Sequence, residues 1–130
     1  MFNKCENLKN IKIPSTVTNI GWSAFSGCKS LTFLNLPERL ATIGNNAFQG
    51  CAFEKITIPA YTSNIGEGAF FLCENLASIE FSAANPSFEI IDGVLFNKNK
   101  NKLLLYPSKL DTVTQHAVPS SVSTIAYGAF

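Results

Sequence analysis

Apolar residues recur along the chain in two short patterns that alternate with each other. The first pattern has two apolar residues separated by one polar residue, usually followed by proline. It occurs as Ile11-Lys12-Ile13-Pro14, Leu34-Asn35-Leu36-Pro37, Ile56-Thr57-Ile58-Pro59 and, without the proline, Ile79-Glu80-Phe81. A period of two predicts a β-strand with one buried face. Because proline has no N–H group for a strand ladder, each strand is expected to end there.

The second pattern is the string Ile-Gly-x-x-Ala-Phe, which begins six residues after the proline. It occurs at residues 20–25, 43–48, 65–70 and, with alanine in place of the glycine, 125–130. In the first three copies a cysteine follows three residues after the phenylalanine, and Phe2 and Cys5 keep the same spacing. We call the part of this string that ends in Ala-Phe the Ala-Phe step, and we expect it to form a short helix or a 3₁₀ turn.

The two patterns together form a repeat: Phe25, Phe48 and Phe70 are 23 and 22 residues apart. This is the period of a leucine-rich repeat. It predicts an α/β repeat fold, a right-handed leucine-rich-repeat solenoid with a parallel strand ladder, in which equivalent residues stack about 4.8 Å apart. The phenylalanines are expected to form a column in the core. The inward ladder is expected to contain Ile11, Leu34, Ile56 and Ile79, with Ile13, Leu36, Ile58 and Phe81.

The period breaks after Phe81. Asn85-Pro86 is a turn signal, and Asp92-Gly93 between apolar runs indicates a two-residue hairpin. We predict a β-meander with strands at 88–91, 94–96 and 102–106 and a polar loop at 97–101. Within one structural domain, the chain is then divided into repeats at 1–81, a meander insertion at 82–109 and a resumed, truncated repeat at 110–130.

Two segments carry a family resemblance. Residues 13–28 read I-P-x-x-V-x-x-I-G-x-x-A-F-x-x-C, and residues 92–107 read D-G-V-L-F-N-K followed by L-L-L-Y-P. Both resemble the BspA-like leucine-rich repeat family of bacterial cell-surface proteins. The resemblance implies an extracellular or cell-surface location. One departure is Thr62, which stands where the other copies have valine or leucine.

Composition narrows the classes of function. Hydrophobic residues make up 46% of the 130-residue chain and charged residues 15%, which excludes a disordered chain. A net charge of +1 argues against a nucleic-acid partner bound by phosphate neutralisation. No segment has the roughly 20 apolar residues of a membrane helix, and no secretion signal follows Met1, so we expect no membrane insertion by this segment.

All four cysteines, Cys5, Cys28, Cys51 and Cys73, occupy one position of the repeat. Each repeat forms one coil of the solenoid, so one cysteine per repeat gives a line of thiols, which cannot surround a metal ion. Disulfides between neighbouring coils are the alternative, but parallel side chains make the required torsion awkward. We therefore favour buried free thiols and expect no metal and no cofactor.

Other candidate chemistry is sparse. His116, the only histidine, takes an inward ladder position, where a hydrogen-bonded, partly buried histidine is more common than a catalyst. Lys98, Lys100 and Lys102 indicate either a basic finger for an acidic partner or, as we favour, a solvated hairpin tip. No catalytic or phosphate-binding motif is complete, so we expect no enzyme.

The outward face of the strand ladder is the predicted binding surface, because solenoids bind partners through such continuous faces. We expect a non-enzymatic adhesion module that binds a host or microbial macromolecule: an extracellular-matrix or cell-surface protein, or a glycan. The alternative is an architectural stalk without a ligand. Phe33 is the expected hot spot. The face consists of Asn10, Lys12, Phe33, Asn35, Lys55, Thr57, Ser78 and Glu80.

The chain begins and ends at the same position of the repeat, because Phe2 and Phe130 both correspond to the phenylalanine of the Ala-Phe step. Complete solenoids normally end in polar capping repeats. We therefore expect a piece of a longer array, and we expect its uncovered coils to associate end to end.

Overall fold

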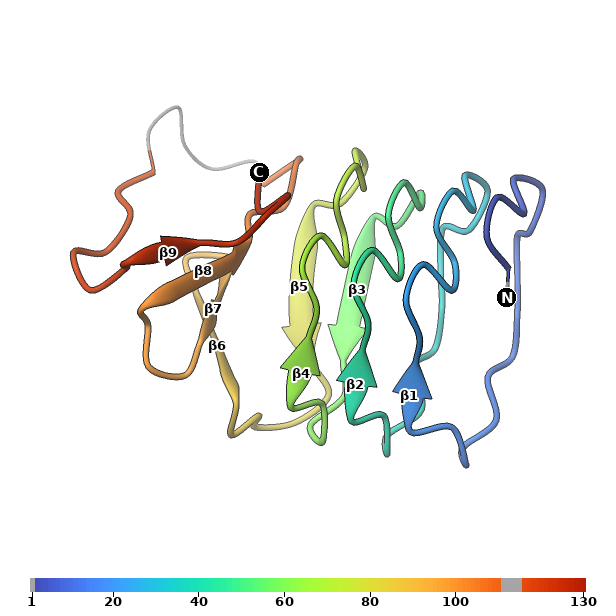
Figure 1. Cartoon of the computed structure of the whole chain (residues 1–130), viewed down its shortest axis with the longest axis horizontal. Helices are drawn as coiled ribbons and strands as arrows, with labels where there is room; N and C mark the ends of the chain where they lie inside the picture. The colour runs from blue at the N-terminus through green and yellow to red at the C-terminus, as the bar shows by residue number, and fades with distance from the viewer. Residues whose placement is uncertain (1, 111–115) are drawn as a thin grey trace.

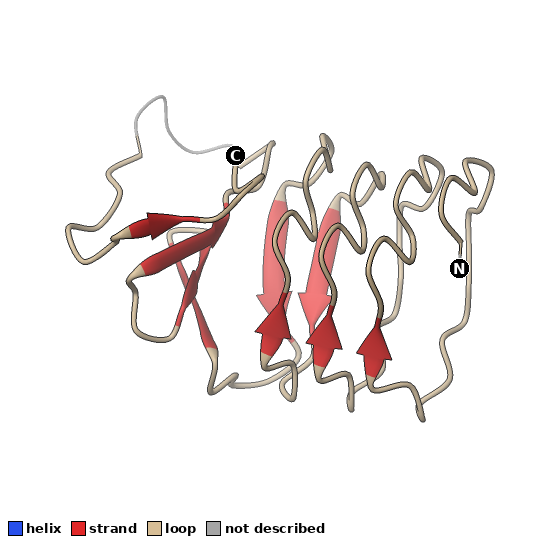
Figure 2. Ribbon diagram, viewed as in Figure 1, coloured by secondary structure: helices blue, strands red, loops and turns tan. Residues whose placement is uncertain are grey.

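The computed structural model describes residues 2–110 and 116–130. The coils stack along the long axis, with the N-terminus at one end and a small β-sheet at the other (Figure 1). Every regular element in the described residues is a strand (Figure 2). The strands are β1 (Asn19–Ile20), β2 (Thr42–Ile43), β3 (Lys55–Ile58), β4 (Asn64–Ile65), β5 (Ser78–Phe81), β6 (Phe88–Ile91), β7 (Val94–Asn97), β8 (Lys102–Leu105) and β9 (Thr124–Ile125).

Two parallel ladders join the coils, one on each side of the stack (Figure 1). On the front side β1, β2 and β4 pair in that order, with Ile43 between Ile20 and Ile65. On the rear side β3 pairs with β5 in the predicted register, Ile56 opposite Ile79. The front ladder was not predicted, because a strand of two residues is too short to show alternation. The right-handed sense of the coils stays a prediction.

The predicted rear ladder of four strands is only half formed. Residues 10–13 and 33–36 form no strand in the described chain. β3 contains Ile56, Thr57 and Ile58, whose β-branched side chains favour pairing, whereas residues 33–36 read Phe-Leu-Asn-Leu. The strand prediction is therefore wrong for the first two coils, and their rear segments lie unpaired.

The predicted phenylalanine column is confirmed. The rings of Phe2, Phe25, Phe48 and Phe70 lie 5.3–5.5 Å apart in sequence order and within 17° of parallel. Phe53 packs edge-on against Phe48, also 5.5 Å away. Phe48 and Phe53 are fully buried, so loss of either ring would cost about 3–5 kcal/mol.

The Ala-Phe step is a series of turns and not a helix. In the first full coil, alternate N–H groups have different partners. Those of Ala24, Ser26 and Cys28 donate to carbonyls three residues back, and those of Ser23, Phe25 and Gly27 donate to Asn45, Ala47 and Gln49. A 3₁₀ helix needs consecutive bonds to the third residue back. Single turns closed over three residues therefore form, but no helix does in the described residues, because every second N–H group binds the next coil.

The predicted meander strands are confirmed: β6, β7 and β8 pair antiparallel. Asp92 and Gly93 join β6 to β7 with φ angles of 49° and 80°, as the two-residue hairpin requires. The Asn97 side chain closes the next loop by accepting the N–H groups of Asn101 and Lys102. The domain boundaries at 82 and 109 stay predictions, and the resumed repeat lies partly outside the described residues.

The meander interrupts the front ladder. β9 pairs in parallel with β8 and not with β4, and Leu103 stands opposite Ile125. The ring of Phe130 stacks on Tyr106 at 5.2 Å, so the phenylalanine column ends at Phe70. The following turn nevertheless returns to the stack, because the Gly68 N–H donates to the Tyr127 carbonyl at 3.0 Å.

Buried Asn85 fastens the start of the insertion to the coil before it. Its Nδ2 group donates to the carbonyl oxygens of Pro59, Ala60 and Thr62 at 3.3, 3.2 and 2.9 Å. Its Oδ1 atom accepts the N–H groups of Ser87 and Phe88. The Thr62 hydroxyl, buried where other coils have an apolar side chain, donates to the Leu40 carbonyl at 2.8 Å. The predicted turn signal therefore also supplies a buried polar anchor.

Replacing Gly93 with valine should lower the free energy of unfolding by more than about 1 kcal/mol, because a β-branched residue is strained at positive φ. A Cβ atom there would also lie 2.5 Å from Leu110 Cδ1. Urea unfolding measures the effect. Gly21→Val is the matched control, because a Cβ atom at Gly21 meets no atom within 4 Å. Equal losses in the two variants would contradict the assigned turn.

Candidate interaction surface

The residues predicted to bind a partner lie on the rear side, along β3, β5 and the unpaired segments 10–13 and 33–36. Seven of the eight side chains are exposed, and Ser78 is half-buried. Phe33 stands out because it is 59% exposed although it is a large apolar ring. We call these eight residues the rear face: Asn10, Lys12, Phe33, Asn35, Lys55, Thr57, Ser78 and Glu80.

Phe33 and Asn35 lie between two open hollows. One, of about 470 Å³, is lined by residues 10–13 and 33–35. The other, of about 340 Å³, lies between residues 33–36 and β3 and also reaches Glu38 and Ser82. Both flank the segment that forms no strand. The unpaired segment thus gives the rear face depressions beside an exposed aromatic ring.

The rear face carries mixed, mostly compensated charge. Lys55 Nζ lies 2.7 Å from Glu80 Oε2, and both side chains are about half exposed. The Glu38 carboxylate accepts the hydroxyl of Ser82 at 3.0 Å. Lys12 makes no ion pair within the described residues. The arrangement suits a mixed polar and apolar contact rather than a strongly charged partner.

The cysteines are free thiols, and three of them form the predicted buried line. The thiols of Cys28, Cys51 and Cys73 donate to phenylalanine carbonyls of the preceding coil at 3.2 Å each. Burial raises their pKa, that of Cys73 to about 12. Cys5 is exposed, so the prediction of four buried thiols is wrong there: no described coil precedes it.

His116 differs from its prediction. Its half-buried ring meets the Tyr106 ring edge-on at 5.3 Å, but its Nε2 atom has no hydrogen-bond partner among the described residues. The expectation of a hydrogen-bonded histidine therefore does not hold for that nitrogen. Within residues 2–110 and 116–130, no three His, Cys, Asp or Glu side chains are grouped to hold a metal ion.

The lysines of the meander do not form a basic finger. Lys100 Nζ lies 3.2 Å from Glu89, and Lys102 Nζ lies 2.5 Å from Glu67. Only Lys98 of the three makes no ion pair in the part of the chain that the structure describes. Two of the three charges are compensated locally, which favours the solvated hairpin tip.

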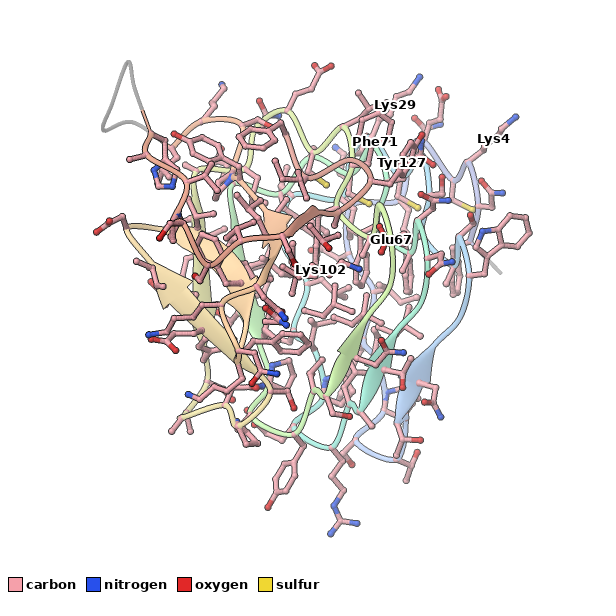
Figure 3. The ribbon with its side chains drawn as sticks, turned by 60° about the vertical axis from the view of Figure 1, so that its left-hand side comes forward. Lys4, Lys29, Glu67, Phe71, Lys102 and Tyr127 are labelled. Atoms are coloured by element: carbon pink, nitrogen blue, oxygen red, sulfur yellow. The ribbon has the colours of Figure 1, made fainter. Side chains whose placement is uncertain are left out.

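Glu67 is the residue that sequence reasoning missed. One carboxylate oxygen accepts the Lys102 ammonium from β8, and the other accepts the Tyr127 N–H at 2.8 Å (Figure 3). The hydrogen bond from Lys102 lowers the pKa of Glu67, and the Tyr127 N–H lowers it further. The available signal was its place in the repeat, because Glu67 is a charged residue at the position where the first two copies have Trp22 and Asn45. Glu67 links the meander to the coils on both sides of it.

Sequence comparison assigns the whole chain to one repeat type. The BspA type leucine-rich repeat region matches residues 1–130 in six copies. No curated protein sequence matches the chain. Across the described residues, no helix is long and apolar enough to cross a membrane.

Solved structures of bacterial proteins are similar to the chain. A leucine-rich repeat protein from Bacteroides ovatus is 44% identical over 61% of this chain and 21% of its own, with a TM-score of 0.60. The pneumococcal vaccine antigen PcpA is 31% identical over 95% of this chain and 31% of its own, with a TM-score of 0.87. A leucine-rich cell surface protein from Faecalibacterium prausnitzii is 32% identical over 99% and 40%, with a TM-score of 0.85. The chain spans less than half of each.

Thiol titration should detect one thiol in the native protein and four after denaturation without reductant. Cys5 is exposed, whereas the other three thiols are buried and bonded to carbonyls. Ellman's reagent provides the measurement, and Cys5→Ser should reduce the native value to zero. Two or fewer thiols in the denatured chain would indicate disulfides.

Glu67→Gln should remove an acid-sensitive part of the stability. The pKa of Glu67 is depressed in the folded protein, so its contribution is present above the unfolded pKa and is lost as pH falls through the folded pKa. Because the pair is partly exposed, we expect a loss on the order of 0.5–1 kcal/mol at pH 7. Urea unfolding at neutral and acidic pH measures it.

The control is Glu74→Gln, an exposed glutamate that makes no ion pair among the described side chains. At acidic pH, Glu67→Gln should unfold at nearly the same urea concentration as the parent chain. A Glu67→Gln penalty that is unchanged in acid would show that the charge of Glu67 contributes nothing.

Proposed function

Because the chain belongs to the BspA-type leucine-rich repeat family, we propose that it is a non-enzymatic cell-surface module that binds an extracellular protein through its rear face. The observation that carries the proposal is the placement of Phe33, 59% exposed between two hollows. The relatives with solved structures are themselves leucine-rich repeat proteins.

The chemistry of the rear face supports a protein partner. Buried aromatic anchors dominate the energetics of protein interfaces, and polar rims surround them. Phe33 can serve as such an anchor, because the hollows beside it can receive partner side chains. Asn35, Thr57 and the Lys55–Glu80 pair supply hydrogen-bonding groups around it. The predicted site is thus one ring with a mixed polar rim.

Two similar structures support the location. One is a leucine-rich cell surface protein and the other is a pneumococcal vaccine antigen. A location on the outside of a bacterial cell and a role in adhesion agree with a rigid stack of coils that presents a continuous face.

The second candidate is a stalk or spacer without a ligand. It is favoured by the continuous phenylalanine column and by the bonds between successive turns, which would make the coils a stiff rod. End-to-end association also stays a prediction. It is supported by an apolar hollow on the first coil, lined by Phe2, Ile20 and Phe25 among others.

The test is binding of the intact chain to purified extracellular-matrix and cell-surface proteins, with a glycan array in parallel. Combined replacement of Phe33 and Asn35 by alanine should weaken protein binding by at least about tenfold, the effect of losing a central aromatic anchor. Leu72→Ala is the control, because this exposed apolar residue lies in a turn outside the rear face. Equal binding by the double variant would refute the rear face, and a parent chain that binds nothing would favour the stalk.

A further inference from the structure

The front half of each coil, which holds β1, β2 or β4 and the following turn, is almost free of charge. Residues 13–28, 40–53 and 116–130 contain no Asp, Glu, Lys or Arg, and residues 59–73 contain only Glu67. Glu67 is itself compensated by Lys102 at 2.5 Å. Lys4 is an exception at the N-terminal end: this exposed residue lies in the turn that stacks on the first full coil, where its N–H donates to the Ser26 carbonyl at 2.7 Å. Apart from Lys4 and the Glu67–Lys102 pair, this long side of the molecule is therefore polar and uncharged.

Two large aromatic side chains project from this side. Trp22 is 68% exposed and Tyr127 is 63% exposed, whereas most large apolar side chains of the chain are buried in its core. They occupy equivalent positions in the first and the last coil, each two residues before the alanine of its Ala-Phe step. The Phe71 ring lies 5.4 Å from Tyr127 at an angle of 52°, so the second platform is a pair of rings (Figure 3).

Trp22 and Tyr127 are the ends of a single column. Asn45 and Glu67 are its middle members, and one backbone hydrogen bond joins each step. These bonds run from Ser23 N–H to Asn45, from Asn46 N–H to Glu67 and from Gly68 N–H to Tyr127, at 2.9–3.0 Å. The column has three steps from Trp22 to Tyr127, and each step is about as long as the spacing between paired strands. The backbones of Trp22 and Tyr127 therefore lie about 14 Å apart. The column therefore presents two aromatic platforms at a defined distance.

Neutral hydrogen-bonding groups surround the column. Asn45 is exposed, and its Nδ2 group is left for a ligand because Oδ1 accepts the Glu67 N–H. Along β1 and β4, exposed amides and hydroxyls repeat from coil to coil. They include Thr18, Asn19, Ser63 and Asn64. Such groups can both donate and accept hydrogen bonds without a charge.

We propose that this front side binds a linear, neutral oligosaccharide that stacks on Trp22 and Tyr127. Sugar rings present apolar C–H faces to aromatic rings and hydroxyl groups to amides, which matches both features of the surface. A nucleic acid would need a cationic surface. The site lies on the other side of the stack from the rear face and does not depend on the proposed protein binding.

The assay follows the fluorescence of Trp22, which is the only tryptophan in the chain. The probes are cellohexaose, xylohexaose, mannohexaose and chitohexaose, each with the matching disaccharide. At least one hexasaccharide should produce a saturable change in emission that raised salt leaves unchanged. Its disaccharide should bind more weakly, because it cannot reach both aromatic platforms.

Variants locate the site by calorimetry with the hexasaccharide that binds. Trp22→Ala and Tyr127→Ala should each weaken binding by about tenfold, the value of one aromatic stack. Tyr61→Ala is the control, because Tyr61 is also highly exposed but lies outside the column. Absence of binding by all four hexasaccharides would overturn the proposal, as would equal losses in Tyr61→Ala and Trp22→Ala.

Discussion

Stacking of coils at the distance of one peptide hydrogen bond is the constraint on which the structure depends. In the first two full coils, alternate N–H groups of the turn bind the next coil, so equivalent side chains such as Phe25 and Phe48 lie above one another. At the Ile-Gly step the backbones come so close that a Cβ atom at Gly44 would lie 2.7 Å from the Gly21 carbonyl carbon. The one copy with alanine, at Ala126, follows β9, which is not stacked on β4.

The same constraint explains how the insertion is accommodated. On the front side, β8 of the meander pairs with β9 in the place of a strand from the preceding coil. In the same way, Tyr106 stacks on Phe130 in the place of a phenylalanine from that coil. The turn around Gly68 still binds the turn of the last coil directly. Polar side chains fasten the two joins: Asn85 binds the preceding coil, and Glu67 binds both β8 and the last turn. The insertion thus enters the stack without leaving these hydrogen-bonding groups unpaired.

Stacking also separates the chemistry of the two sides of the molecule. Inward positions are filled mainly by phenylalanine, leucine, isoleucine, alanine and three cysteines, so the outward columns can differ between coils with least disturbance of the core. On the rear side these columns carry compensated charges around Phe33. On the front side they carry amides and hydroxyls between Trp22 and Tyr127. Two surfaces of different chemistry therefore share one scaffold, which is how a solenoid can offer more than one binding face.

The sequence by itself determined the repeat, the phenylalanine column, the buried cysteine line and the Asp92-Gly93 hairpin. Each depends on residues close in sequence or on strict periodicity, which local patterns record. Only the tertiary structure decided that the Ala-Phe step is a chain of turns, because the partners of its N–H groups belong to the next coil. It also decided which rear segments pair, that β9 joins β8, and that Glu67 meets Lys102 across 35 residues. These outcomes depend on which groups of different coils meet as partners, and the periodicity of a sequence does not record those partners.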